Sequence, residues 1–131
     1  MIVLDASALL ELLLGTDQGQ GVAARIAAPE ETLHAPHLLD LEVAQVLRRY
    51  CVSSRLKVGR AEQALADLRA LDLQRYAHEP MLPRIWQLRD NLTAYDAAYV
   101  ALAEVLSATL LTFDARLASA ARHSVRIELL T

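Results

Sequence analysis

Two aspartates stand where an apolar, strand-like segment gives way to a helical one. Asp5 follows the run "MIVL", and Asp114 follows the run "TLLTF". In an open α/β sheet, ligands bind outside the carboxyl ends of the strands, at the point where the order of the connections reverses. Each aspartate could instead only cap the next helix, because its side chain can accept hydrogen bonds from the free N–H groups of the first turn. For either residue taken alone, both interpretations stay open.

Glu42 lies beside the apolar face of a predicted helix. In "PHLLDLEVAQVLRRY" it borders the stripe that contains Val46, whereas Asp40 lies about 160° away around the helix and is expected to face water. An ionised glutamate beside a core is costly unless it is paired or bound to a metal ion. The alternatives to metal binding are stabilisation by the helix dipole and an ion pair with Arg48 or Arg49.

Asp96 repeats this pattern in "LTAYDAAYVALAEVL". It shares a helix face with Tyr99, Val100 and Ala103, which are expected to pack on the sheet. The four residues that begin at Thr93 also match the Thr-x-x-acid capping pattern. One helix start could therefore provide both a cap and a metal ligand.

One shared site explains these acids better than four separate roles. Asp5, Glu42, Asp96 and Asp114 all lie at strand ends or in first helical turns and face inward. Carboxylate oxygens with few histidines or cysteines nearby favour Mg²⁺ or Mn²⁺. Because such ions keep several waters and commonly bridge to phosphates, the predicted chemistry is phosphoryl transfer or phosphodiester hydrolysis.

The elements that must position the acids alternate along the chain. Strands are expected at residues 2–4, 32–35, 73–76, 109–113 and 125–129, and helices near 7–14, 18–27, 38–54, 60–71, 80–89, 94–106 and 115–122. This alternation predicts right-handed crossovers and a mostly parallel sheet covered on both faces. The expected fold is of the α/β class, a three-layer α/β/α sandwich with about five strands, in a single domain over residues 1–131.

The composition fits a packed domain and permits a nucleic-acid partner. Hydrophobic residues make up 54% of the chain and charged residues 22%, which excludes extensive disorder. The net charge is −3, but a metal site that neutralised four of the 16 acids would leave 12 acidic against 13 basic residues. Every basic residue except Lys57 is an arginine, whose planar guanidinium suits phosphate.

The sequence does not indicate export or a membrane. The apolar start "MIVLDASALLELLLG" lacks a basic leader and is interrupted by Asp5 and Glu11, which argues against a signal peptide and a membrane span. Cys51 is the only cysteine, so no internal disulfide can form. A reducing, cytoplasmic location is expected.

Four motifs together resemble a known family. The segments "IVLDASALL", "APHLLDLE", "TAYDAAYVALAE" and "LLTFDARLA" are similar, in this order and over nearly the whole chain, to the motifs of PIN-domain ribonucleases, in particular the VapC toxins of toxin–antitoxin pairs. The resemblance implies a metal-dependent endoribonuclease in which Asp5, Glu42, Asp96 and Asp114 form the acidic metal site. It also implies an RNA substrate, an antitoxin partner and a homodimer.

The resemblance also assigns supporting residues. Ser7 and Thr112 match the hydroxyl positions beside the first and last acids and are expected to hydrogen-bond those ligands or their waters. Arg116 stands where some relatives carry a further acid. For phosphate binding, Arg89 and Arg116 are the first candidates because they lie close in sequence to Asp96 and Asp114, and the alternative for both is an ordinary solvated arginine.

Other functions fit the sequence less well. A receiver domain of two-component signalling needs an aspartate on its middle strand and a lysine after a later strand, but "LQRYA" has no aspartate and Lys57 lies in a turn between helices. A zinc enzyme is disfavoured because His34 and His37, interpreted as loop histidines, lack a third ligand at useful spacing. No GxxxxGK or GxGxxG phosphate loop is present. The remaining alternative is a catalytically silent module of the same fold that binds an antitoxin or regulates, with acids that receive arginines of its partner.

Overall fold

A five-stranded parallel sheet forms the centre of the computed structural model, which describes all of residues 1–131. The strands are β1 (Ile2–Leu4), β2 (Leu33–Pro36), β3 (Leu73–Tyr76), β4 (Thr109–Thr112) and β5 (Ile127–Leu129). Their order across the sheet is β3-β2-β1-β4-β5, and every neighbouring pair is parallel. The predicted α/β class and number of strands are confirmed, although β5 begins two residues later than expected.

Seven α-helices connect or follow these strands. They are α1 (Ala6–Leu14), α2 (Asp17–Ile26), α3 (Leu38–Val52), α4 (Val58–Ala70), α5 (Leu82–Gln87), α6 (Ala94–Leu106) and α7 (Ala115–Ala121). The single helix expected over 80–89 is wrong in detail, since a 3₁₀ turn at Glu79–Met81 precedes the shorter α5. Pro80 and Pro83 cause this division, because proline has no N–H to donate and fits only the first turn of a helix.

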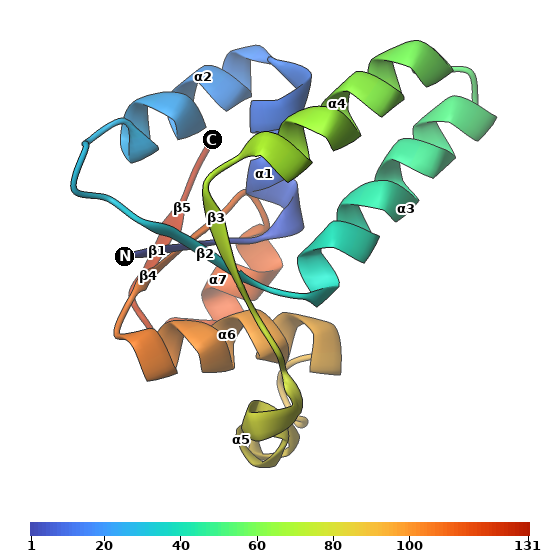
Figure 1. Ribbon diagram of the computed structural model, residues 1–131. Helices are drawn as coiled ribbons and strands as arrows, with labels where there is room; N and C mark the ends of the chain where they lie inside the picture. The colour runs from blue at the N-terminus through green and yellow to red at the C-terminus, as the bar shows by residue number, and fades with distance from the viewer.

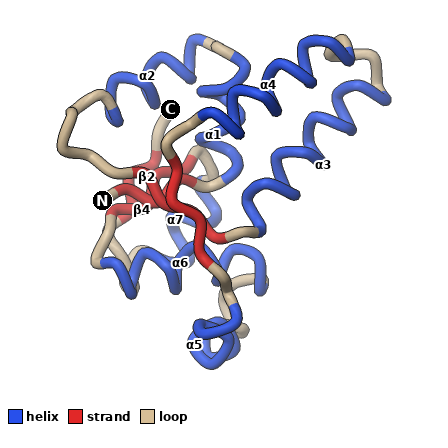
Figure 2. Tube along the Cα trace, viewed as in Figure 1, coloured by secondary structure: helices blue, strands red, loops and turns tan.

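The helices cover both faces of the sheet. From β1 the chain proceeds through β2 to β3 in one direction, and it then returns to build β4 and β5 on the other side of β1. Right-handed crossovers therefore place α1 to α4 on one face and α5 to α7 on the opposite face. Figure 1 shows α1, α2 and α4 on one side of the strands and α6 on the other, and Figure 2 shows the same layers by element type. The predicted three-layer arrangement is confirmed.

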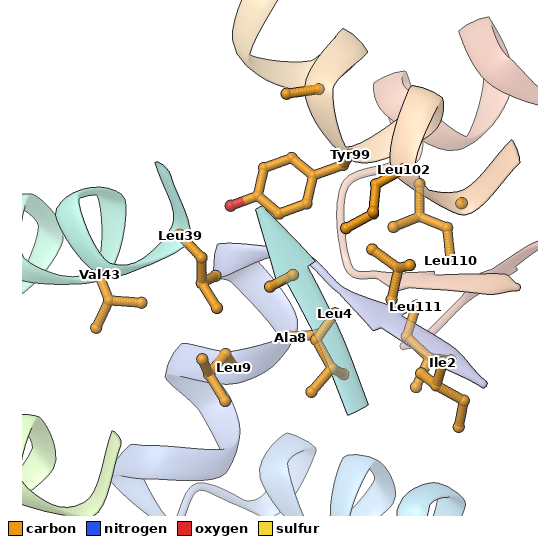
Figure 3. Close-up of a cluster of buried hydrophobic side chains, with 14 of the residues drawn as sticks. Ile2, Leu4, Ala8, Leu9, Leu39, Val43, Tyr99, Leu102, Leu110 and Leu111 are labelled. Carbon is orange, nitrogen blue, oxygen red and sulfur yellow. The ribbon is translucent and has the colours of Figure 1, made fainter. Parts of the chain in front are cut away.

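The core lies between these layers. The three residues of the central strand β1 are completely buried, as are Leu110 and Leu111 of its neighbour β4. All residues of α6 from Ala97 to Ala103 are buried, so the middle of this helix is enclosed on every side. Figure 3 shows the packed side chains from both faces of the sheet meeting around β1. None of the helices has the length and apolar character needed to cross a membrane.

The turn from α1 to α2 depends on a close backbone contact at Gly19. Thr16 caps α2 by accepting a hydrogen bond from the Gly19 N–H at 3.0 Å, and a Cβ atom at Gly19 would lie 2.1 Å from the Glu11 carbonyl oxygen. No real side chain tolerates that separation, so glycine is required for the two helices to pack.

Replacement of Gly19 by alanine should destabilise the protein by about 1–3 kcal/mol, because it forces α1 and α2 apart. Gly21→Ala is the matched control, since nothing lies within 4 Å of a Cβ there and alanine favours a helix by up to about 1 kcal/mol. Urea unfolding measures both changes. Equal unfolding midpoints for the two variants would contradict the predicted contact.

Candidate active site at the carboxyl ends of the strands

Asp5 joins the end of β1 to the start of α1 and is 6% exposed. Its Oδ1 accepts hydrogen bonds from the Ala8 N–H at 3.0 Å and from the Ser7 hydroxyl at 2.6 Å. Its Oδ2 accepts a hydrogen bond from the Thr112 hydroxyl of β4. Asp5 is therefore a helix cap, as the simpler interpretation held, and is also fixed in place by two hydroxyl groups.

The two hydroxyl groups tie the ends of β1 and β4 together. Ser7 Oγ accepts a hydrogen bond from the Phe113 N–H at 3.0 Å, and Thr112 Oγ1 accepts one from the Asp114 N–H at 2.9 Å. Each hydroxyl can accept a hydrogen bond from the backbone that directly follows β4 while it donates its own proton to Asp5. The expected contacts of Ser7 and Thr112 with an acid of the site are present in the structure.

Asp114 also caps a helix. Its Oδ1 accepts hydrogen bonds from the N–H groups of Arg116 at 2.9 Å and Leu117 at 3.2 Å, at the start of α7. Its Oδ2 has no protein partner. The cap thus orients the carboxylate and leaves one oxygen available for a ligand.

Asp96 lies in the first turn of α6 and is half-buried. The predicted cap is confirmed, because Thr93 Oγ1 accepts a hydrogen bond from the Asp96 N–H at 3.1 Å. The capping hydroxyl acts on the backbone of Asp96. Capping of this helix therefore does not involve the carboxylate oxygens of Asp96, which stay available to a ligand.

Glu42 is half-buried on α3, as its position beside the apolar stripe predicts. Its Oε1 accepts a hydrogen bond from the Tyr99 hydroxyl of α6. Neither Arg48 nor Arg49 forms an ion pair with it. The proposed alternative of a local ion pair is therefore wrong.

Asp40, the other acid of this helix, is separate from the site. Arg75 of β3 donates to both of its carboxylate oxygens, at 2.8 and 3.1 Å. The expectation that Asp40 simply faces water is incomplete, because this ion pair with a distant strand holds it partly buried. Its charge is already neutralised, which distinguishes it from Glu42.

Burial and mutual repulsion raise the pKa values of three of the four acids. For Asp5, Glu42 and Asp96 the larger cause is desolvation, and the charges of neighbouring carboxylates add to it. Asp114 repels Asp5 and Asp96, and both Asp5 and Asp96 repel Glu42. The four carboxylates, far apart in the sequence, therefore lie within one electrostatic field.

The four-acid cluster has the chemistry of a divalent-metal site. None of its members takes part in a salt bridge, so its negative charge has no paired cation within the protein. Its donors are all hard oxygens, which suit Mg²⁺ or Mn²⁺. The side chains do not form a closed ligand shell as they stand, because no three acidic, histidine or cysteine groups converge closely enough to hold an ion.

The two candidate arginines differ in their surroundings. Arg116 lies in the first turn of α7. Its positive charge offsets part of the increase that desolvation and the neighbouring carboxylates cause in the pKa of Asp96. The guanidinium of Arg89 lies over the Trp86 ring, 4.9 Å from its centroid, and donates to the Trp86 carbonyl oxygen. Arg116 is therefore the better placed of the two to meet a phosphate at the cluster.

His34 corrects one expectation. It lies in β2 and is buried, which agrees with the strand predicted over residues 32–35, and its interpretation as a loop histidine is wrong. Its two ring nitrogens are 2.7 Å from the Tyr76 hydroxyl and 2.7 Å from the Thr32 hydroxyl. Burial is possible because both nitrogens have partners, and the absence of a zinc-binding role stays a prediction.

Tyr99 has a polar role in addition to the packing role that the sequence predicts for it, because its hydroxyl donates a hydrogen bond to Glu42. The sequence feature that could have indicated this hydrogen bond is the position of Tyr99, one helical turn after Asp96 on the same face. A buried tyrosine hydroxyl usually needs a hydrogen-bond partner, and Glu42, which is also predicted to face inward, can accept such a bond.

Removal of one acid should stabilise the metal-free protein at neutral pH. A carboxyl group whose pKa is raised by folding binds its proton more tightly in the folded state. The free energy of unfolding therefore decreases as pH rises from the ordinary pKa of the group through its raised pKa in the folded protein. In EDTA at about pH 7.5, Asp96→Asn should melt above wild type, and the difference should shrink as pH falls toward the ordinary value of 3.8.

Calorimetric melting in EDTA over this pH range measures the difference. Asp72→Asn, an exposed change at the opposite, amino-terminal end of β3, is the control and should not reproduce the gain. Equal melting temperatures of wild type and Asp96→Asn at neutral pH, or a difference that grows as pH falls, would contradict the predicted burial and repulsion of the Asp96 carboxylate.

Comparison with known proteins identifies the family. A model described as the PIN domain matches residues 2–123. Ribonuclease VapC9 of Mycobacterium tuberculosis is 46% identical over 117 residues, which cover 89% of this chain and 88% of the relative. Ribonuclease VapC12 of the same organism is 41% identical over 129 residues and covers 98% of both chains.

Solved structures share the fold. PAE2754 from Pyrobaculum aerophilum has a TM-score of 0.70 and 22% identity, and the match covers 96% of this chain and 87% of that one. VapBC2 from Rickettsia felis, bound to a DNA fragment from their promoter, has a TM-score of 0.70 and 15% identity over the full length of both chains. The family match over residues 2–123 and the identity to the VapC ribonucleases show that this chain belongs to the PIN-domain family, among its VapC members.

Proposed function

We propose that this chain is a divalent-metal-dependent endoribonuclease and the toxin of a toxin–antitoxin pair. The observation that carries the proposal is the four-acid cluster, in which Asp5, Glu42 and Asp96 are desolvated and repelled by neighbouring carboxylates, and in which no acid forms a salt bridge. The cluster lies beside β1 and β4, where the connections of the sheet change direction and ligands bind in open α/β folds. The curated relatives are named ribonucleases, which supports hydrolysis of RNA as the reaction.

Asp5, Glu42, Asp96 and Asp114 would hold Mg²⁺ or Mn²⁺. When bound, such an ion stabilises negative charge on a scissile phosphate and activates a water molecule. The contribution of the protein is orientation. Backbone N–H groups and hydroxyls fix the aspartates at strand and helix ends, so that little reorganisation is needed when charge develops on the phosphate.

Other side chains would act on the RNA and the attacking water. Asp96 or Glu42 would orient the water, because both are half-buried and have raised pKa values that suit a group receiving a proton. Arg116 would contact a phosphate next to the cluster. Arg89, with its guanidinium stacked on the exposed Trp86, would contact RNA farther away.

The partner proposal is an antitoxin that regulates the ribonuclease in the cytoplasm, with the toxin as a homodimer. FitAB and VapBC2, two of the solved structures with this fold, are described as bound to DNA fragments. A cavity of about 410 Å³ between the starts of α3 and α6 and the helix α5 offers an apolar surface beside the cluster. Leu41 and Tyr95, at its border, are 75% and 64% exposed, which is costly for residues of this kind without a partner.

The Asp114→Asn variant separates a metal ligand from a helix cap. Asparagine caps a helix about as well as aspartate, so the α7 cap should survive and melting without metal should stay equal or rise. Loss of one negative charge from a divalent site should reduce cleavage of RNA by about 100-fold or more. Cleavage of total RNA in Mg²⁺ and Mn²⁺ measures this effect.

Asp17→Asn in α2 is the control, because it changes an aspartate in the first turn of a helix outside the cluster. Full cleavage by a folded Asp114→Asn protein would return Asp114 to the role of a cap. Wild-type protein that binds the metal ion but cleaves no RNA would favour the alternative, a catalytically silent module.

A further inference from the structure

Tyr99 connects the two helical layers at the cluster. It lies on α6, one turn after Asp96, and its side chain is 2% exposed. Figure 3 shows its ring among the core side chains, with the hydroxyl directed away from Leu102 and toward α3. The hydroxyl donates its hydrogen bond to Oε1 of Glu42.

This bond is the only hydrogen bond that the Glu42 side chain forms with the protein. No other group donates to either oxygen of Glu42, and no other side-chain hydrogen bond joins α3 to α6. By contrast, Asp114 and one oxygen of Asp5 are held by donors within three residues of them in the sequence, and the other oxygen of Asp5 is held by Thr112. A glutamate has more rotatable bonds than an aspartate and loses more rotamer freedom when it is fixed.

We propose that Tyr99 is a positioning residue that holds Glu42 toward the four-acid cluster. The hydrogen bond occupies Oε1 and leaves Oε2 without a protein partner, available to a divalent ion. This inference rests on the proposed metal-dependent function. Partners that hydrogen-bond a ligating carboxylate typically change metal affinity by about 10- to 100-fold, which sets the size of the expected effect.

The position of the hydroxyl supports this role beyond simple packing. A phenylalanine would fill the same core space between β1 and α6, so the hydroxyl is not required for burial of the ring. Glu42 is only half-buried. Without the hydrogen bond from Tyr99, the carboxylate of Glu42 is free to turn toward water. There it is better solvated and is farther from the carboxylates of Asp5 and Asp96, which repel it.

The test is Mn²⁺ binding by the full chain with Tyr99→Phe. Isothermal titration should give a dissociation constant for Mn²⁺ about 10-fold or more above that of wild type. Because the ring is kept, the melting temperature in EDTA should stay close to that of wild type. RNA cleavage should be impaired at limiting Mn²⁺ and restored by excess Mn²⁺, since mass action refills a weakened site.

Three further variants serve as controls for this test. Tyr76→Phe is the matched control, because it removes another tyrosine hydroxyl that bonds a buried side chain, His34, and should leave Mn²⁺ binding unchanged. Glu42→Gln should weaken binding by itself. If Tyr99 acts only through Glu42, the double variant Glu42→Gln with Tyr99→Phe should bind Mn²⁺ no more weakly than Glu42→Gln alone.

Each outcome decides between the two proposals. Wild type that does not bind Mn²⁺, or Glu42→Gln that binds it as well as wild type, would overturn the metal site together with the role of Tyr99. Weakened binding by Glu42→Gln but not by Tyr99→Phe would overturn the role of Tyr99 alone. A double variant weaker than Glu42→Gln would mean that Tyr99 acts on the fold as a whole, which also contradicts the proposal.

Discussion

Negative charge gathered in a poorly solvated place is the constraint on which this structure depends. Asp5, Glu42 and Asp96 are all harder to ionise than free acids, because burial removes water and the other carboxylates repel them. The fold offsets part of this cost with backbone N–H groups at helix starts and with the hydroxyls of Ser7 and Thr112. Arg116 offsets part of the repulsion at Asp96, but none of the four acids forms a salt bridge. A bound divalent cation would relieve the repulsion that is left.

The topology of the sheet brings the acids together. β1 and β4 are adjacent and their following helices lie on opposite faces, which is the arrangement at whose carboxyl strand ends open α/β sheets bind ligands. Asp5 follows β1 and Asp114 follows β4, while Glu42 of α3 and Asp96 of α6 come from the two opposite layers. Tyr99 spans the two layers and ties Glu42 to the helix that carries Asp96. A site of this kind requires the whole fold, not one local motif.

Local patterns in the sequence predict most of the elements, and they single out the four acids that we propose as the metal site. Apolar runs predict the strands, and capping residues such as Thr93 and Asp114 mark helix starts, because these features depend on neighbours along the chain. The ion pair of Asp40 with Arg75 and the hydrogen bond of Tyr99 with Glu42 depend on residues far apart in the sequence. They could not be predicted without knowing where the fold places α3 relative to β3 and α6.

A crystal grown or soaked in Mn²⁺, with data collected at a wavelength where manganese scatters anomalously, tests the central claim most directly. The claim is that the four carboxylates share one divalent ion beside the ends of β1 and β4. It predicts an anomalous peak at roughly 2.0–2.6 Å from carboxylate oxygens of the cluster, with Asp5, Asp96 and Asp114 among the ligands. A peak bound only by residues outside the cluster, or none in crystals of protein that cleaves RNA, would contradict the account.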